Sequence, residues 1–155
     1  IRDSITKDVP IVSSAGALVR TLDDLGLRKI AVVTPYMPPL TKMVVEYIEA
    51  EGFEVVDSVS LSVANNLAVG RLDPAHLPKH VRDLDHSGAD GIVLSACVQM
   101  PSLAAIEAVE DQTGLPVVTA ATCTAREVLM ALGLDPVVPG AGAALAAKAR
   151  AGVPA

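Results

Sequence analysis

Four short runs rich in aliphatic residues recur along the chain, each separated from the next by a longer segment with helix signals. The runs are Lys29–Thr34, Glu54–Leu61, Gly91–Ser95 and Leu115–Thr119. Short apolar runs bounded by glycine, proline and polar residues are typical of strands. A run without polar alternation, such as Gly91–Ser95, is typical of a strand buried on both faces. The pattern therefore predicts four strands.

Helix start and stop signals fill the intervals between these runs, because Ser, Thr or Asp precedes several segments and Gly follows most of them. The predicted helices run from Ser13 or Ser14 to Gly26, from Thr41 to about Glu51, from Asp73 to near Gly88, from Pro101 to Gln112 and from Thr124 to Leu132, and a glycine turn at Pro139–Gly142 precedes a final helix reaching Arg150. Single helices between successive strands give right-handed crossovers and a parallel sheet. The sequence therefore predicts an α/β fold, a flavodoxin-like doubly wound four-stranded parallel sheet with helices on both faces, forming one domain over residues 1–155.

Composition narrows the class of protein. Of the 155 residues, 51% are hydrophobic and only 2% are aromatic, so the core must be aliphatic, which suits a parallel sheet. The net charge of −6 and the lack of a basic patch argue against nucleic acid as a partner. The apolar runs are too short for a membrane span, and no secretory signal is visible. Two cysteines do not make a disulfide framework, so we expect free thiols and a cytoplasmic protein without a membrane partner.

Cys97 is the strongest candidate for chemistry, because ligands of such sheets bind at the carboxyl ends of the strands. It follows the run Gly91–Ser95 and precedes the helix predicted from Pro101. A thiol at a helix N-terminus faces free amides and the positive end of the helix dipole, and both favour the reactive thiolate. The amides of Val98 and Gln99 are also candidates for holding a substrate carboxylate. The alternative is that Cys97 is only a small packed residue.

Other polar residues follow the remaining strands. Tyr36 comes after the first strand, where a phenol can donate a hydrogen bond to a carboxylate. Asn65 and Asn66 form a loop after the second strand, where an amide can bind a carboxylate or simply favour a turn. Cys123 follows the fourth strand and either faces the same crevice or packs in the core. No His or acidic residue stands at metal-ligand spacing from either cysteine, so no metal site is predicted.

Four segments together resemble a known family. They are Val32–Tyr36, the Asn65–Asn66 loop, Leu94–Leu103 and Pro139–Gly142. These segments resemble the maleate cis–trans isomerases of the aspartate/glutamate racemase superfamily, which has arylmalonate decarboxylases as relatives. The resemblance covers nearly the whole chain, and the segment around Cys97 is quite specific.

The resemblance implies two similar α/β domains with the substrate between them, each supplying one cysteine. This chain resembles the second domain with the C-terminal tail, so we expect an N-terminal domain that is not in this chain. Cys97 matches the cysteine of the second domain, and Tyr36 and Asn66 match substrate-binding residues. The cysteine of the first domain has no counterpart here, because Cys123 is in the wrong place.

The reaction implied by the resemblance is isomerisation of maleate to fumarate without a cofactor. A thiolate of the missing domain adds to the double bond, and Cys97 supplies and then removes a proton. Tyr36, Asn66 and the Val98 amide would hold a carboxylate of this small dicarboxylate substrate. We also expect the intact protein to be a homo-oligomer.

Two alternatives remain open at this point. The chain could belong to a racemase or decarboxylase of the same superfamily, and a decarboxylase needs only one cysteine to protonate a planar enediolate. It could also be a catalytically silent flavodoxin-like domain that binds a ligand or partner, because this fragment alone holds only half of an interdomain site.

Overall fold

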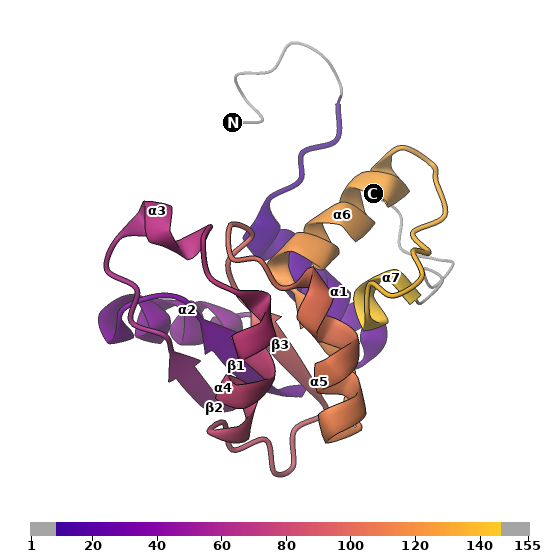
Figure 1. Ribbon diagram of the computed structural model, residues 1–155. Helices are drawn as coiled ribbons and strands as arrows, with labels where there is room; N and C mark the ends of the chain where they lie inside the picture. Colours follow the sequence, from indigo (N-terminus) through magenta and orange to yellow (C-terminus); the bar gives the residue numbers. More distant parts are fainter. Residues whose placement is uncertain (1–8, 147–155) are drawn as a thin grey trace.

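A four-stranded parallel sheet forms the centre of the computed structural model, which describes residues 9–146 (Figure 1). The strand order is β2-β1-β3-β4. The strands are β1 (Lys29–Thr34), β2 (Glu54–Ser60), β3 (Gly91–Ser95) and β4 (Val117–Thr119). This order and the parallel pairing confirm the predicted flavodoxin-like sheet.

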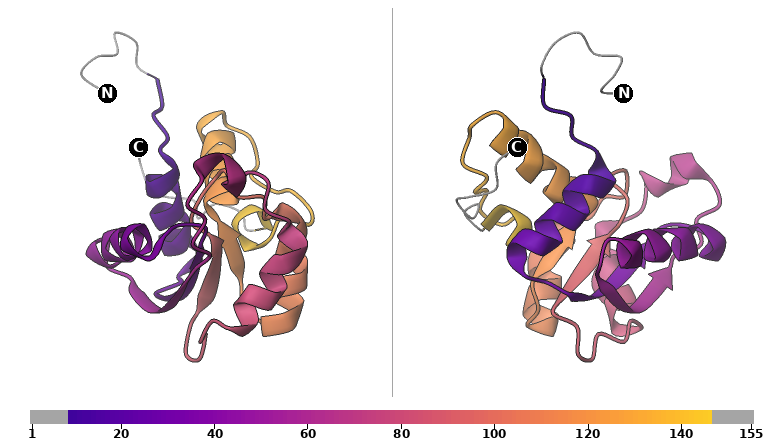
Figure 2. Two further views of the ribbon diagram at one scale, coloured as in Figure 1. Left: turned by 60° about the vertical axis from the view of Figure 1, so that its left-hand side comes forward. Right: turned by 180° about the vertical axis from the view of Figure 1, so that it is seen from behind.

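Helices cover both faces of this sheet (Figure 2). They are α1 (Ser14–Leu25), α2 (Pro38–Ala50), α3 (Asn66–Val69), α4 (Leu77–Arg82), α5 (Ile106–Thr113), α6 (Ala120–Ala131) and α7 (Ala143–Ala146), with single 3-10 turns at Pro74–His76 and Leu103–Ala105. Side chains alternate along a strand, so β1 sends Ile30 and Val32 into the core with α1, α2 and α6. Ala31 and Val33 enter the core with α4 and α5. Both cores are almost wholly aliphatic, as the composition predicts.

Helix α1 agrees closely with its sequence signals. The Ser13 side chain accepts a hydrogen bond from the Gly16 amide at 3.1 Å, and Gly26 closes the helix in the left-handed conformation at φ 73°. Helix α2 differs from the prediction, because Pro38 and Pro39 open its first turn and Thr41 lies inside it. Proline suits that position since the first helical amides have no partner within the helix. The prediction that Thr41 caps α2 is therefore wrong.

Three further helix boundaries differ from the sequence signals. The helix predicted from Asp73 to Gly88 is a 3-10 turn followed by α4, which ends at Arg82. The helix predicted from Pro101 begins only at the turn Leu103–Ala105, because Ser102 has φ −145° and makes no capping hydrogen bond. The last full helix begins at Ala120 instead of Thr124, since Thr119 ends β4 and caps α6 at once. The predicted helix from Pro139–Gly142 to Arg150 is present as α7, and its remainder lies outside the described residues.

Within residues 9–146, no helix is both long and apolar enough to cross a membrane. The prediction of a homo-oligomer stays a prediction.

Candidate active site

The strand order reverses between β1 and β3, and this is where ligands bind in open α/β sheets. β1 and β3 lie side by side from Ile30 to Val32 and from Gly91 to Val93. Tyr36 follows β1 and Cys97 follows β3, so both residues lie beside this switch point. The structure therefore brings together the two candidates that the sequence placed 61 positions apart.

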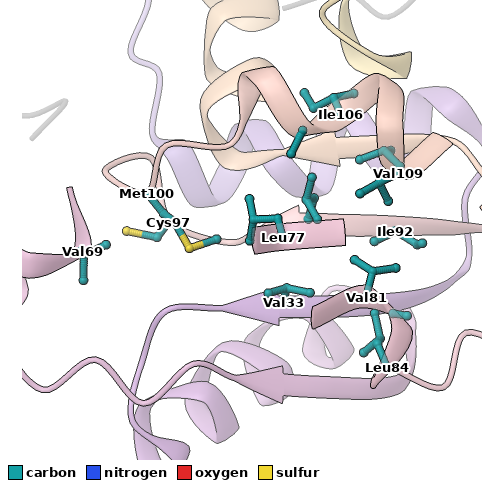
Figure 3. Close-up of a cluster of buried hydrophobic side chains, with 14 residues drawn as sticks. Val33, Val69, Leu77, Val81, Leu84, Ile92, Cys97, Met100, Ile106 and Val109 are labelled. Carbon is teal, nitrogen blue, oxygen red and sulfur yellow. The ribbon is translucent and has the colours of Figure 1, made fainter. Parts of the chain in front are cut away.

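Cys97 is held at the base of a tight turn. Its amide donates to Ser95 Oγ at 3.2 Å, and Ser95 Oγ donates back to the Cys97 carbonyl at 2.7 Å. The Met100 amide donates to the same carbonyl at 3.3 Å. Cys97 is 8% exposed and packs beside Met100 at one end of the buried cluster that also holds Val69 (Figure 3). The Cys97 side chain is thus nearly buried, and the buried Ser95 hydroxyl fixes the Cys97 backbone.

The expected effect of a helix dipole on Cys97 is not supported. Helix α5 begins at Ile106, and even the preceding 3-10 turn begins at Leu103. The dipole acts mainly within the first turn of a helix, so residues 98–102 separate the thiol from it. The turn around Cys97, rather than a helix end, determines the surroundings of the thiol.

Tyr36 is partly buried and packs against the buried cluster that contains Cys97. Burial raises the pKa of the Tyr36 phenol well above its usual value. A side-chain hydrogen bond with Cys97 and the charge of that thiolate raise the pKa further. Tyr36 therefore remains a neutral hydrogen-bond donor at physiological pH, next to the thiol.

Asn66 and Val98 lie on the exposed side of the same edge. The Asn65 side chain accepts a hydrogen bond from the Leu67 amide at 2.9 Å and caps the single turn α3, so Asn66 starts a helix instead of lying in a loop. Gln99 Nε2 donates to the Asn66 carbonyl at 2.8 Å, which ties this turn to the loop after β3. Val98 is 51% exposed in that loop. Asn66 and Val98 thus face solvent, on two segments joined by Gln99.

Cys123 does not share this edge. It lies in the first turn of α6, is 0% exposed and packs in the core formed by α1, α2 and α6. Burial raises the pKa of its thiol to about 12, against the smaller opposing effects of the Thr21 hydroxyl and the Arg126 charge. The alternative that Cys123 faces the crevice is wrong, and the packing interpretation holds.

We predict that iodoacetamide modifies Cys97 and leaves Cys123 unmodified in the folded chain. The thiolate is the reactive form, and Cys123 combines a raised pKa with full burial. Peptide mapping by mass spectrometry after a short exposure measures both sites in one sample. Equal modification of the two thiols before unfolding would contradict this assignment, and unfolded chain provides the control in which both react.

Two residues that support this architecture were not predicted from the sequence. Ser95 fixes the Cys97 backbone through its hydroxyl. Its position two residues before the cysteine is the sequence feature that could have indicated this role. Arg126 is 1% exposed in α6, where it contacts Asp24 of α1 and donates to the Ala144 carbonyl of α7, each at 3.2 Å. No sequence pattern distinguishes this arginine from a surface one.

An apolar hollow adjoins the site on the side of α1 and α2. It has a volume of about 270 Å³, and Tyr36, Ala96 and Ala120, each following a strand end, form part of its wall. Tyr36 therefore borders both the hollow and the Cys97 thiol. In residues 9–146, no group of three or more His, Cys, Asp or Glu side chains is placed to hold a metal ion.

The sequence model described as arylmalonate decarboxylase matches residues 3–145. The chain belongs to this family. The resemblance to maleate isomerases is also confirmed, because the chain is 56% identical over 135 residues to the maleate isomerase of Alcaligenes faecalis.

Solved structures agree with this similarity. A cysteine-to-alanine variant of the maleate isomerase Iso from Pseudomonas putida S16, determined with maleate, superposes with a TM-score of 0.86 at 50% identity over 88% of this chain and 55% of that one. A cysteine-to-serine variant of the Nocardia farcinica maleate cis–trans isomerase, with a covalently bound succinylcysteine intermediate, superposes with a TM-score of 0.82 at 47% identity over 86% of this chain and 54% of that one.

The chain spans about half the length of the curated relatives it matches. The alignment to the Alcaligenes faecalis enzyme covers 87% of this chain and 53% of the relative.

Proposed function

We propose that this chain supplies one half of the active site of a maleate cis–trans isomerase, with a preceding α/β domain supplying the other half. The observation that carries the proposal is the packing of Tyr36 against the cluster that holds Cys97 at the switch point, in a chain 56% identical to a maleate isomerase. A small dicarboxylate would bind over this edge. A cytoplasmic location is part of the proposal, because both cysteines are free thiols.

The proposed reaction begins with a thiolate of the other domain. Its sulfur forms a bond to one olefinic carbon of maleate, and the π electrons move to the second carbon, which takes the proton of the Cys97 thiol. The resulting succinyl thioether has a single carbon–carbon bond and rotates. The Cys97 thiolate then removes a proton from the second carbon, the electron pair reforms the double bond, and the first thiolate leaves with fumarate released. The succinylcysteine in the Nocardia farcinica structure supports such an intermediate.

This chain would also bind and polarise the substrate. Addition to the double bond places negative charge beside a carboxylate, and fixed hydrogen-bond donors stabilise that charge. The neutral Tyr36 hydroxyl, the Asn66 amide and the Val98 backbone amide are the donors we assign to this role. Because the Gln99 side chain donates to the Asn66 carbonyl, it would hold the segments that carry Asn66 and Val98 at a fixed distance from each other.

We expect Tyr36→Phe to lower kcat/KM for maleate by about 10- to 100-fold, the effect of losing a hydrogen bond to a charged group. Because the pKa of Tyr36 is raised, the phenol stays protonated across the working range, so the loss should be the same factor from acid to moderately alkaline pH. Kinetics over a pH series measure this. A loss confined to alkaline pH would contradict a donor role for Tyr36. Tyr47→Phe, near the C-terminal end of α2, is the matched control and should retain activity.

The need for a second domain is tested by assaying this chain alone and the two-domain protein under the same conditions. Conversion of maleate is followed through the absorbance of the conjugated diacid, with the 155-residue chain alone and with the two-domain protein. We expect turnover only in the two-domain protein. Turnover by the chain alone would overturn the claim that the other domain supplies an essential thiol.

Decarboxylation is the second candidate, because the matching family model is described as arylmalonate decarboxylase. There Cys97 alone would protonate the enediolate left by loss of carbon dioxide. The two functions differ in substrate, so release of carbon dioxide from an arylmalonate, without conversion of maleate, would favour the decarboxylase.

A further inference from the structure

Three hydroxyl groups meet beneath the loop that carries Tyr36. Thr34 ends β1, Ser60 ends β2 as its register partner, and Thr41 lies in the first turns of α2. Thr41 Oγ1 lies 2.7 Å from Thr34 Oγ1 and accepts a hydrogen bond from Ser60 Oγ at 2.7 Å. One threonine hydroxyl therefore joins α2 to the carboxyl ends of two strands.

The Thr41 hydroxyl is the central group of this cluster, and we call it the hub because it contacts the other two hydroxyls and the Met37 carbonyl. A hydroxyl has one proton and two acceptor positions. Ser60 Oγ donates to Thr41 Oγ1, and either threonine can be the donor in the 2.7 Å contact between the two threonine hydroxyls, with the Met37 carbonyl at 3.4 Å as a second acceptor for the Thr41 proton. Thr41 Oγ1 therefore contacts three groups at once. Removing this hydroxyl would leave the fully buried Thr34 without this hydrogen-bond partner, which is costly.

The Tyr36 loop is short and is held at both of its ends by this hub. It runs from Pro35 to Met37. The preceding residue, Thr34, shares a hydrogen bond with Thr41, and the Met37 carbonyl accepts from Thr41. The Leu61, Ser62 and Val63 amides donate to the carbonyls of Thr34, Tyr36 and Pro35, in that order, at 2.9 to 3.1 Å. Ser62 adopts a left-handed φ of 56° at this point, which is rare for a non-glycine residue. The backbone of Tyr36 thus has little freedom.

We propose that Thr41 is a positioning residue, whose hydroxyl fixes the loop so that the Tyr36 phenol reaches the Cys97 thiol. The hydrogen bonds of the Thr41 side chain go to Thr34, Met37 and Ser60 and not to the thiol or the phenol, so it acts through the loop. The importance of this contact for turnover rests on the proposed function, whereas the contact itself can be measured in this chain without any activity.

The test is carbon-13 NMR of chains labelled at the tyrosine ring carbon that bears the hydroxyl. The chain has only two tyrosines, so Tyr47→Phe assigns the Tyr36 signal. Cys97→Ala gives the position of that signal without its thiol partner. We expect Thr41→Val, which keeps the shape and removes the hydroxyl, to move the Tyr36 signal toward the Cys97→Ala position. Thr41→Ser, which keeps the hydroxyl, should leave it in place.

Three results would overturn the proposal. They are an unmoved Tyr36 signal in folded Thr41→Val, an equal movement of the Tyr36 and Tyr47 signals, and failure of Thr41→Ser to retain the native signal. If Thr41→Val does not fold, Ser60→Ala removes one arm of the hub at a partly exposed position, and an unmoved Tyr36 signal there overturns the proposal equally.

Kinetics in the two-domain protein test the catalytic consequence separately. We expect Thr41→Val to lower kcat/KM by about tenfold alone and by less than about twofold in a Tyr36→Phe background, because residues acting through one another are not additive. Equal losses in both backgrounds would show a merely structural role. Failure of the proposed function would appear as no maleate turnover in the unaltered protein, with the NMR result unaffected.

Discussion

We expect that replacing Cys97 with serine in the proposed two-domain protein will lower kcat for maleate by about 10²- to 10⁴-fold, the range that a positioned acid–base group contributes. A serine hydroxyl fills the same space and can retain contact with Tyr36, but it is a far weaker acid than a thiol. The loss should therefore fall on kcat, with KM changed little, because the substrate-binding residues stay in place. Steady-state kinetics of the purified variant measure both constants.

Cys123→Ala is the matched control for this experiment. It removes the other thiol of the chain from the core between α1, α2 and α6, away from Tyr36. We expect kcat within about twofold of the unaltered protein, and a modest loss of stability from the cavity. Comparable loss of kcat in both cysteine variants would contradict the assignment of the acid–base role to Cys97 alone.

Gly142→Ala should give the largest loss of stability among the glycine positions within residues 9–146. Gly142 has φ 74°, and a methyl group there would lie 2.8 Å from the Val117 carbonyl oxygen and against the Ile106 side chain. Both neighbours belong to elements of the core, so neither can move freely. We expect a loss of about 2–4 kcal/mol, which combines an unfavourable backbone conformation with overpacking. Chemical denaturation of the 155-residue chain measures it.

Gly133→Ala separates the two contributions. Its φ of 71° is nearly the same, but nothing lies within 4 Å of the added methyl group. We expect a loss of about 1–2 kcal/mol from the backbone conformation alone. If both variants lose the same stability, the turn at Gly142 is not packed against β4 and α5 as the structure shows.

The sheet and its switch point were predictable from the sequence because aliphatic runs define buried strands directly. β1 and β3 were predicted to the residue, and a residue that follows a strand is placed at the ligand-binding edge by topology alone. Tyr36 and Cys97 were found in this way. Their contact was not predictable, because it depends on how two loops fold over the edge.

The helix starts were less predictable because short polar residues have several uses. Thr41 resembled a cap, yet its hydroxyl joins two strand ends, since two prolines had already opened α2. Thr119 was predicted only as the end of a strand, although its side chain and that of Thr122 form a reciprocal capping box. The spacing of these two threonines was a usable signal, and it would have placed Cys123 inside α6.

The most direct test of the account is to locate the covalent adduct formed on maleate in the Cys97→Ser two-domain protein. If Cys97 is the acid–base residue, its loss slows the proton removal that precedes release of fumarate, so the covalent adduct should accumulate. Mass spectrometry with peptide mapping should then find a succinyl group on a cysteine outside this chain. An adduct on a residue of this chain, or turnover of Cys97→Ser at the unaltered rate, would contradict the account.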